Sequence, residues 1–245
     1  MIEIDKLLET QRVWQGISPD DYAIIRKMAS ESLTKCREAI PILIENLKEI
    51  GYVWAVSEQL PADVIEKNTL ALEKIIGSPV PQMLKLFWEK VGGVSFVDLE
   101  KYRHIEFWKE HKIRGPKYFC DGLYVDSCCD GWTSSVCNDF IDWKEFYAPN
   151  KPEDFLISLS PDGYMKDNIS GGSPYGIFPG NSWKPIWQYF EWSGVERPIS
   201  APEDPPDFLS YLRTTILECA GFPAFFGVPA FDPIKERLLR GVLIF

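Results

Sequence analysis

The sequence lacks an excess of basic residues and has almost no histidine. Its 245 residues include 26 Lys and Arg against 36 Asp and Glu, which gives a formal net charge of −10. A negative net charge opposes binding to a phosphate backbone, so we expect no nucleic-acid partner. His104 and His111 are the only histidines, and a zinc site would need further ligands. We therefore expect no metal and no cofactor.

Long apolar runs and a secretory leader are also missing. No run approaches the roughly 20 apolar residues of a membrane-spanning helix. The chain begins MIEID, whereas a secretory signal begins with basic residues followed by an apolar stretch. The 6 cysteines are too few for a disulfide scaffold in a chain of this length, so free thiols are expected. Together these absences predict a cytoplasmic protein without a membrane partner.

The common catalytic signatures are absent. The sequence contains no GxxxxGK[ST], GxGxxG, HExxH or GxSxG motif, the patterns that bind phosphate, hold zinc or present a nucleophilic serine. Four cysteines lie within eighteen residues: Cys120, Cys128, Cys129 and Cys137. Zinc sites use more closely spaced pairs, so buried thiols acting as small apolar side chains are the favoured interpretation. A cysteine nucleophile with a histidine base stays open as an alternative.

What the sequence does have is apolar residues in helical order. Hydrophobic residues make up 45% of the chain and aromatic residues 14%, which excludes intrinsic disorder. Between Ser18 and Gly51 apolar residues recur at steps of three and four, which predicts one long helix with a kink at Pro41. Shorter helices are predicted over residues 4–14, 63–76, 81–91 and 208–220.

From Val94 onward the pattern changes to short apolar runs separated by Gly, Pro, Asp and Asn, which is typical of strands. Strands are predicted over residues 122–126, 132–136, 155–160, 163–169 and 187–192, and a strand or extended link over 52–56. Pro161-Asp162-Gly163 predicts a hairpin turn. This order predicts an α+β fold, a mostly antiparallel sheet flanked by helices on one side. We expect residues 1–62 to form a helical extension that packs on a main domain of residues 63–245.

Acidic residues concentrate in the second half of the chain. Residues 120–219 carry 6 basic and 16 acidic residues, an excess equal to the whole net charge. Acidic side chains with tryptophan anchors are what a binder of a basic protein presents. The predicted contact residues are Asp126, Asp130, Trp132, Asp139, Asp142 and Trp143. The same acidity would also serve solubility alone, and a carboxylate pair for acid–base catalysis could be drawn from the cluster.

A family resemblance appears in residues 72–93, LEKIIGSPVPQMLKLFWEKVGG. The segment has a helix ending in Leu-Glu and glycine, an apolar-proline pair, a helix with an inward aromatic residue, and Gly-Gly. The residues in these positions are Gly77, Pro81, Trp88, Gly92 and Gly93. The segment resembles the SUKH superfamily, which includes fungal cell-wall-assembly regulators and many bacterial immunity proteins. Residues 155–163 and 207–212 resemble its central hairpin and closing helix, so the resemblance covers about residues 63–220.

The resemblance implies a protein without a catalytic constellation. Bacterial members often bind and block a toxin, frequently a nuclease with a basic surface, so the implied function is that of an immunity-like protein with a basic toxin domain as partner. The chain departs from the family by Val91, where Asn is common before Gly-Gly, and by its N-terminal extension. A regulatory scaffold resembling the fungal members is the alternative, followed by a thiol- or carboxylate-dependent enzyme.

Overall fold

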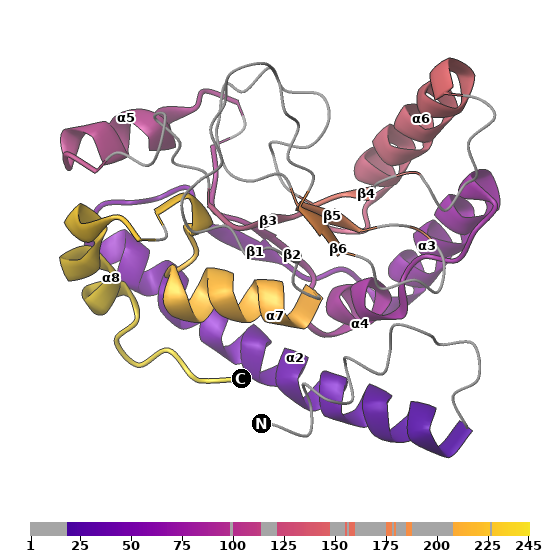
Figure 1. Ribbon diagram of the computed structural model, residues 1–245, viewed down its shortest axis with the longest axis horizontal. Coiled ribbons are helices and arrows are strands. Elements are labelled where there is room, and N and C mark those ends of the chain that lie inside the picture. Colours follow the sequence, from indigo (N-terminus) through magenta and orange to yellow (C-terminus); the bar gives the residue numbers. More distant parts are fainter. Residues whose placement is uncertain are drawn as a thin grey trace.

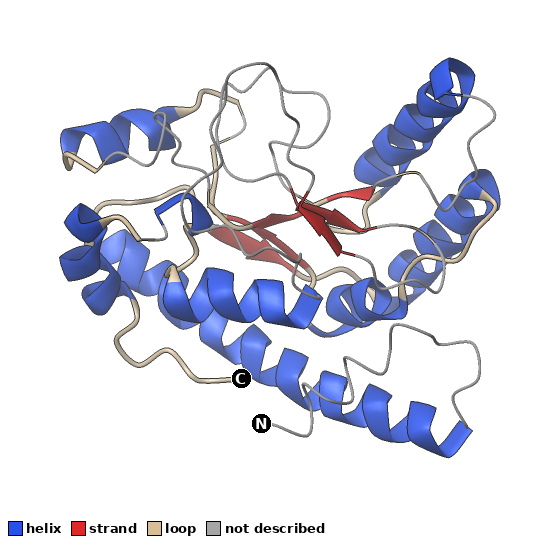
Figure 2. Ribbon diagram, viewed as in Figure 1, coloured by secondary structure: helices blue, strands red, loops and turns tan. Residues whose placement is uncertain are grey.

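The structure is a computed structural model of residues 1–245. It describes residues 19–98, 100–113, 122–147, 155, 157–159, 175–177, 179, 185–187, 208–225 and 227–245. These residues form helices around two small antiparallel sheets (Figures 1 and 2).

The strands form the α+β architecture that the sequence predicts. The first sheet has the order β1-β2-β3, with antiparallel pairing of β1 (Val56–Glu58), β2 (Gly93–Ser95) and β3 (Tyr124–Val125). The second sheet is also antiparallel, in the order β4-β5-β6. Its strands are β4 (Ile157–Ser158), β5 (Tyr175–Ile177) and β6 (Pro185–Trp187).

The helices lie on more than one side of these strands, which corrects the expected one-sided arrangement. In Figure 1, α2 (Pro19–Glu49), α4 (Gln82–Lys90) and α7 (Phe208–Arg213) lie below the strands. The helices α5 (Arg103–Glu110) and α6 (Asp130–Tyr147) lie above them. The remaining described elements are α3 (Ala62–Ile76), α8 (Asp232–Leu238), a π-helix that continues α7 (Thr214–Glu218) and two 3₁₀ turns (Pro223–Phe225, Pro229–Phe231).

The long helix predicted from the apolar spacing is confirmed as α2. Leu33, Cys36, Ile40, Leu43 and Leu47 recur at steps of three and four and are all buried, because such residues share one side of a helix. The helix continues through Pro41, whose side chain is on the exposed side.

The turn between α3 and α4 confirms the two predicted helices and the role of Gly77. Gly77 ends α3 with a left-handed φ of 74° and donates its N–H to the carbonyl of Glu73, a conformation that favours glycine. The Glu73 carboxylate accepts the Val80 N–H at 2.8 Å and pairs with Lys85. Pro81 then precedes the first turn of α4. Glu73 therefore links the end of α3 to the turn and to α4.

The Gly92-Gly93 pair also behaves as predicted, since one glycine takes a left-handed conformation and the other permits a close approach of backbone. Gly92 has a φ of 89°, and a side chain there would overlap the carbonyl oxygen of Glu58. A Cβ on Gly93 would lie 2.8 Å from the backbone nitrogen of Ser127. Only glycines at these two positions allow β2 to lie between β1 and β3.

The strand predicted over residues 132–136 is wrong, because this segment belongs to α6. Val136, Phe140 and Trp143 are buried at helical spacing, while the run Trp132-Thr133 had suggested a strand. The strand predictions over 122–126 and 155–160 are confirmed in part by β3 and β4. The hairpin at 161–163, the strand at 163–169 and the helix at 4–14 lie outside the described residues, as does the predicted 187–192 strand except Trp187, the last residue of β6.

One hydrophobic core joins the described elements. It includes residues of α2, α4, α6 and the C-terminal segment, for example Leu33, Phe87, Phe140 and Phe231. The helix α2 packs against α4 and α8, and β1 pairs with β2. The domain boundary expected at residue 62 therefore falls between two paired strands, and the part of residues 1–62 that is described shares the core of the rest. None of the described helices combines the length and hydropathy that crossing a membrane requires.

Because the backbone of Glu58 lies so close to Gly92, a side chain at this position should destabilise the folded protein. We expect Gly92→Ala to lower the free energy of unfolding by about 1–3 kcal/mol more than Gly77→Ala, because only the first adds a clash with packed backbone. Gly77 is the matched control, since it too has a positive φ but nothing lies within 4 Å of an added Cβ. Urea titration of both variants measures the difference, and equal losses would contradict the role given to Gly92.

Candidate protein-interaction surface

The helix α6 carries five of the six predicted contact residues and part of the core. It packs against α3, and its inward side consists of Val136, Phe140 and Trp143. Trp143 is only 8% exposed; its ring stacks on Phe140 at 5.9 Å and meets Phe155 at 5.6 Å. The expectation that Trp143 is a surface anchor is therefore corrected, because this ring holds α6 to the core.

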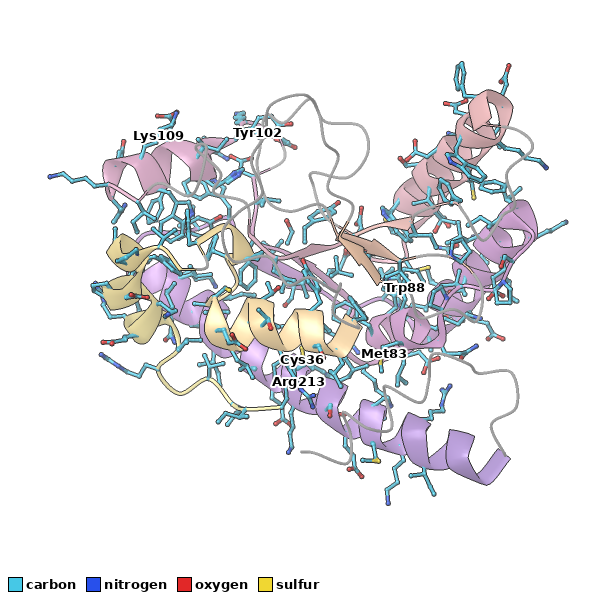
Figure 3. The ribbon with its side chains drawn as sticks, in the orientation of Figure 1. Cys36, Met83, Trp88, Tyr102, Lys109 and Arg213 are labelled. Carbon is cyan, nitrogen blue, oxygen red and sulfur yellow. The ribbon has the colours of Figure 1, made fainter. Side chains whose placement is uncertain are left out.

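Trp132 also has a structural position. It is partly buried and lies edge-on to Trp88, with 5.2 Å between the ring centroids. Trp88 itself is fully buried, and its indole N–H donates to the carbonyl oxygen of Asp126 at 3.0 Å. Figure 3 shows Trp88 between α4 and the strands. The inward aromatic residue predicted for this helix is thus confirmed, and the two tryptophans connect α4, β3 and α6.

Asp126 takes part in a local network beside the first sheet. It is half-buried, and its carboxylate accepts the hydroxyl of Tyr124 at 2.7 Å. Burial raises the pKa of Asp126 above its ordinary value, the Tyr124 hydrogen bond opposes this rise, and the charge of Glu58 adds to it. Ser127 in turn donates its hydroxyl to Glu58 at 3.3 Å. These contacts make Asp126 a less accessible group than the sequence suggested.

The outward side of α6 has a different character. Asp142 and Glu145 are exposed there, together with two large apolar side chains, Ile141 at 52% and Phe146 at 79% exposure. Asp139 lies at the border and is half-buried. We call these five residues the α6 face. Helical spacing places Ile141, Asp142 and Glu145 opposite the buried stripe of Val136, Phe140 and Trp143.

The carboxylates of the α6 face form no ion pair with any residue that the structure describes. Several acidic residues elsewhere have a cation at hand, such as Glu45 with Lys48 at 2.7 Å and Glu89 with Arg26 at 3.2 Å. Among the described residues no ion pair involves Asp139, Asp142 or Glu145. At the other end of the helix, Asp130 is exposed and pairs with Lys67 at 3.5 Å. Three carboxylates without an ion pair among the described residues therefore lie close together on the C-terminal half of α6.

Sequence reasoning found Asp139 and Asp142 but missed Ile141, Glu145 and Phe146. The reason is the strand assigned to residues 132–136, which hid the helical periodicity. In the helix over residues 130–147, Ile141 and Phe146 are apolar residues outside the stripe formed by Val136, Phe140 and Trp143. Apolar side chains that form a patch with a polar rim are a signal of an interface.

The cysteines give little support to thiol chemistry. Cys128 precedes α6 instead of lying on a strand, and its buried Sγ lies 3.7 Å from the Thr69 hydroxyl and 4.0 Å from that of Thr133. Burial raises the pKa of Cys128, and also that of Cys137, whereas a nucleophilic cysteine needs a lowered pKa. Cys128, Cys129 and Cys137 are free thiols. Cys120 lies outside the described residues.

The two histidines have local structural contacts. His104 is buried, and its Nδ1 accepts the backbone N–H of Asp98 at 3.1 Å. His111 lies with its Nδ1 2.8 Å from the carbonyl oxygen of Phe107. Within the part of the chain that the structure describes, no group of three or more His, Cys, Asp or Glu side chains is placed to hold a metal ion.

Neutralising Asp139 should increase the stability of the folded protein, by an amount that depends on pH. Burial, and next the charge of Asp142, raise the pKa of Asp139 in the folded chain. The folded state therefore binds more protons than the unfolded state between the ordinary pKa and the raised one, and the charged carboxylate lowers stability above that window. We expect Asp139→Asn to raise the urea midpoint at about pH 7, with a gain that disappears towards about pH 3.

Glu38, an exposed residue of α2, provides the control for this measurement. Glu38→Gln removes the same unit of charge without relieving a buried carboxylate. A gain that is as large for Glu38→Gln, or that persists unchanged at low pH, would show that the burial of Asp139 is not its cause.

The chain was also compared with known proteins. No family model matches its sequence, and neither the search of curated proteins nor the search of solved structures found a match. The candidate surface therefore has to be interpreted from its own geometry.

Proposed function

We propose that this protein is a non-catalytic protein-binding module that binds a basic protein partner through the α6 face. The observation that carries the proposal is the coexistence, on the outward part of α6, of the exposed Ile141 and Phe146 with three carboxylates that form no ion pair among the described residues. Phe146 is the most exposed large apolar side chain among the described residues, at 79%, and an apolar patch rimmed by polar residues marks an interaction site.

The two kinds of side chain have separate roles in this proposal. Phe146 and Ile141 lose exposed apolar area on contact, which supplies affinity in proportion to the area buried. The carboxylates of Asp139, Asp142 and Glu145 attract Lys and Arg side chains, which speeds association and selects a basic surface. The opposite side of α6, held by Phe140 and Trp143, fixes the helix before the partner arrives, so little ordering cost is added on binding.

The resemblance of residues 72–93 to the SUKH superfamily supports a narrower form of the proposal. In this form the partner is a basic toxin domain, such as a nuclease, and the protein is its immunity-like inhibitor. A nuclease must attract a phosphate backbone with positive charge, so a face with unpaired carboxylates would compete for the same surface. A regulatory scaffold of the same fold would use the α6 face in the same way and differ only in its partner.

The test of this proposal is a binding titration with charge-reversal variants. Purified protein is titrated with basic toxin domains, beginning with any encoded next to its gene. We expect Asp142→Lys with Glu145→Lys to raise the dissociation constant by a factor of about 10 or more and to reduce its dependence on salt. Phe146→Ser should accelerate dissociation, because an anchor side chain acts mainly on the off-rate.

A matched variant separates a local effect from a change in net charge. Glu31 and Glu38 are exposed residues of α2, and Glu31→Lys with Glu38→Lys changes the net charge by the same amount. This variant should bind within a factor of about 2 of the original protein, apart from a change in long-range steering. Equal weakening by both double variants, or no effect of Phe146→Ser, would rule out the α6 face as the binding surface.

A further inference from the structure

The helix α3 presents an exposed leucine between two opposite charges. Leu70 is 58% exposed, and Glu66 and Lys74, one turn before and one turn after it, are also exposed. Residues at i, i+4 and i+8 lie along one side of a helix. The buried residues of α3, among them Ile65 and Leu72, lie on the other side. In Figure 1, α3 forms the right-hand edge of the molecule.

Neither charge is compensated by another residue in the described part of the chain. Among the described residues Glu66 and Lys74 form no ion pair, whereas their neighbours Lys67 and Glu73 pair with Asp130 and Lys85. Glu66 and Lys74 are about 12 Å apart along the helix axis, too far to meet each other. Within α3, Leu70 lies one turn after Glu66 and one turn before Lys74, so neither residue has an opposite charge at that position.

This pattern is complementary to itself. When two copies of α3 lie antiparallel with a two-fold axis at Leu70, each Glu66 faces Lys74 of the second copy and the two Leu70 side chains meet at the axis. A parallel arrangement would place like charges together. In an isologous contact every pair occurs twice, so one exposed stripe supplies two ion pairs around one apolar centre. The exposed Ala71 beside Leu70 has a small side chain that lets the helix axes approach.

We propose that a second copy of this chain docks on α3 and forms a two-fold dimer through Glu66, Leu70 and Lys74. A helix of 15 residues is about 22 Å long. A contact centred on it lies at the small end of specific interfaces, so the dimer exchanges rapidly and populates at high protein concentration. The contact uses none of the five residues of the α6 face, so it stands or falls independently of the proposed function.

The experiment is sedimentation equilibrium of the full chain from about 10 µM to about 1 mM, the range in which weak contacts are populated. The original protein should show a monomer–dimer equilibrium. Glu66→Lys and Lys74→Glu should each raise the dissociation constant by a factor of about 10, because each places two like-charge pairs across the axis. The combined variant Glu66→Lys with Lys74→Glu should restore dimerisation, since it exchanges the two charges. A mixture of the two single variants should form the mixed dimer.

Controls on α2 and at the axis complete the test. Lys35→Glu and Glu38→Lys alter exposed charges on α2 and should leave the dimer unchanged, whereas Leu70→Ser should weaken it without changing the urea midpoint. A protein that stays monomeric up to the highest concentration overturns the proposal. So does a dimer that is indifferent to Glu66→Lys, or a pair of single variants that the charge exchange fails to rescue.

Discussion

The close approach of three strands at Gly92-Gly93 is the constraint on which the rest of the structure depends. The absence of side chains there lets the backbone of Glu58 and that of Ser127 lie against β2 on its two sides. Ser127 leads directly into Cys128, whose carbonyl accepts the side-chain amide of Asn68 at 2.8 Å, and then into α6. The position of α6 on α3 therefore follows from a contact that only glycine permits.

Trp88 extends this constraint to the helices below the strands. Its indole N–H reaches the carbonyl of Asp126, and its ring meets that of Trp132. A buried indole contributes apolar contact area, and the hydrogen bond of its N–H fixes the orientation of the ring. As a result α4, β3 and the first turn of α6 are fixed together, and the C-terminal half of α6 is presented to solvent in a defined orientation.

The two proposed surfaces differ in the way they use charge. The carboxylates of the α6 face have no cation partner among the described residues, which suits a different molecule of opposite charge. The outer stripe of α3 has one charge of each sign on either side of Leu70, which suits a copy of itself. Since α3 and α6 pack against each other, a dimer through α3 would carry two α6 faces, and a partner with two basic sites would bind with increased avidity.

The sequence by itself determined the elements that rest on local periodicity and on special backbone geometry. The spacing of Leu33, Cys36 and Ile40 predicted α2, and Gly77 and Gly92-Gly93 marked the ends of α3 and α4, because helical faces and positive φ values are local properties. The sequence predicted that the strands pair mostly in antiparallel fashion, but not which strands are neighbours. Pairing depends on residues far apart in the chain, such as Ser57 and Val94.

Only the tertiary structure decided which acidic and aromatic residues are available to a partner. Asp139 and Asp142 were found from composition, but Trp143 faces the core and Phe146 faces solvent, and a count of residue types contains no information about either direction. Burial depends on what packs against each side of a helix. In α6 the packing partners are α3 and Phe155, which lie in other parts of the chain. For this reason the acidic residues counted in the sequence could be assigned to an exposed surface only in the folded protein.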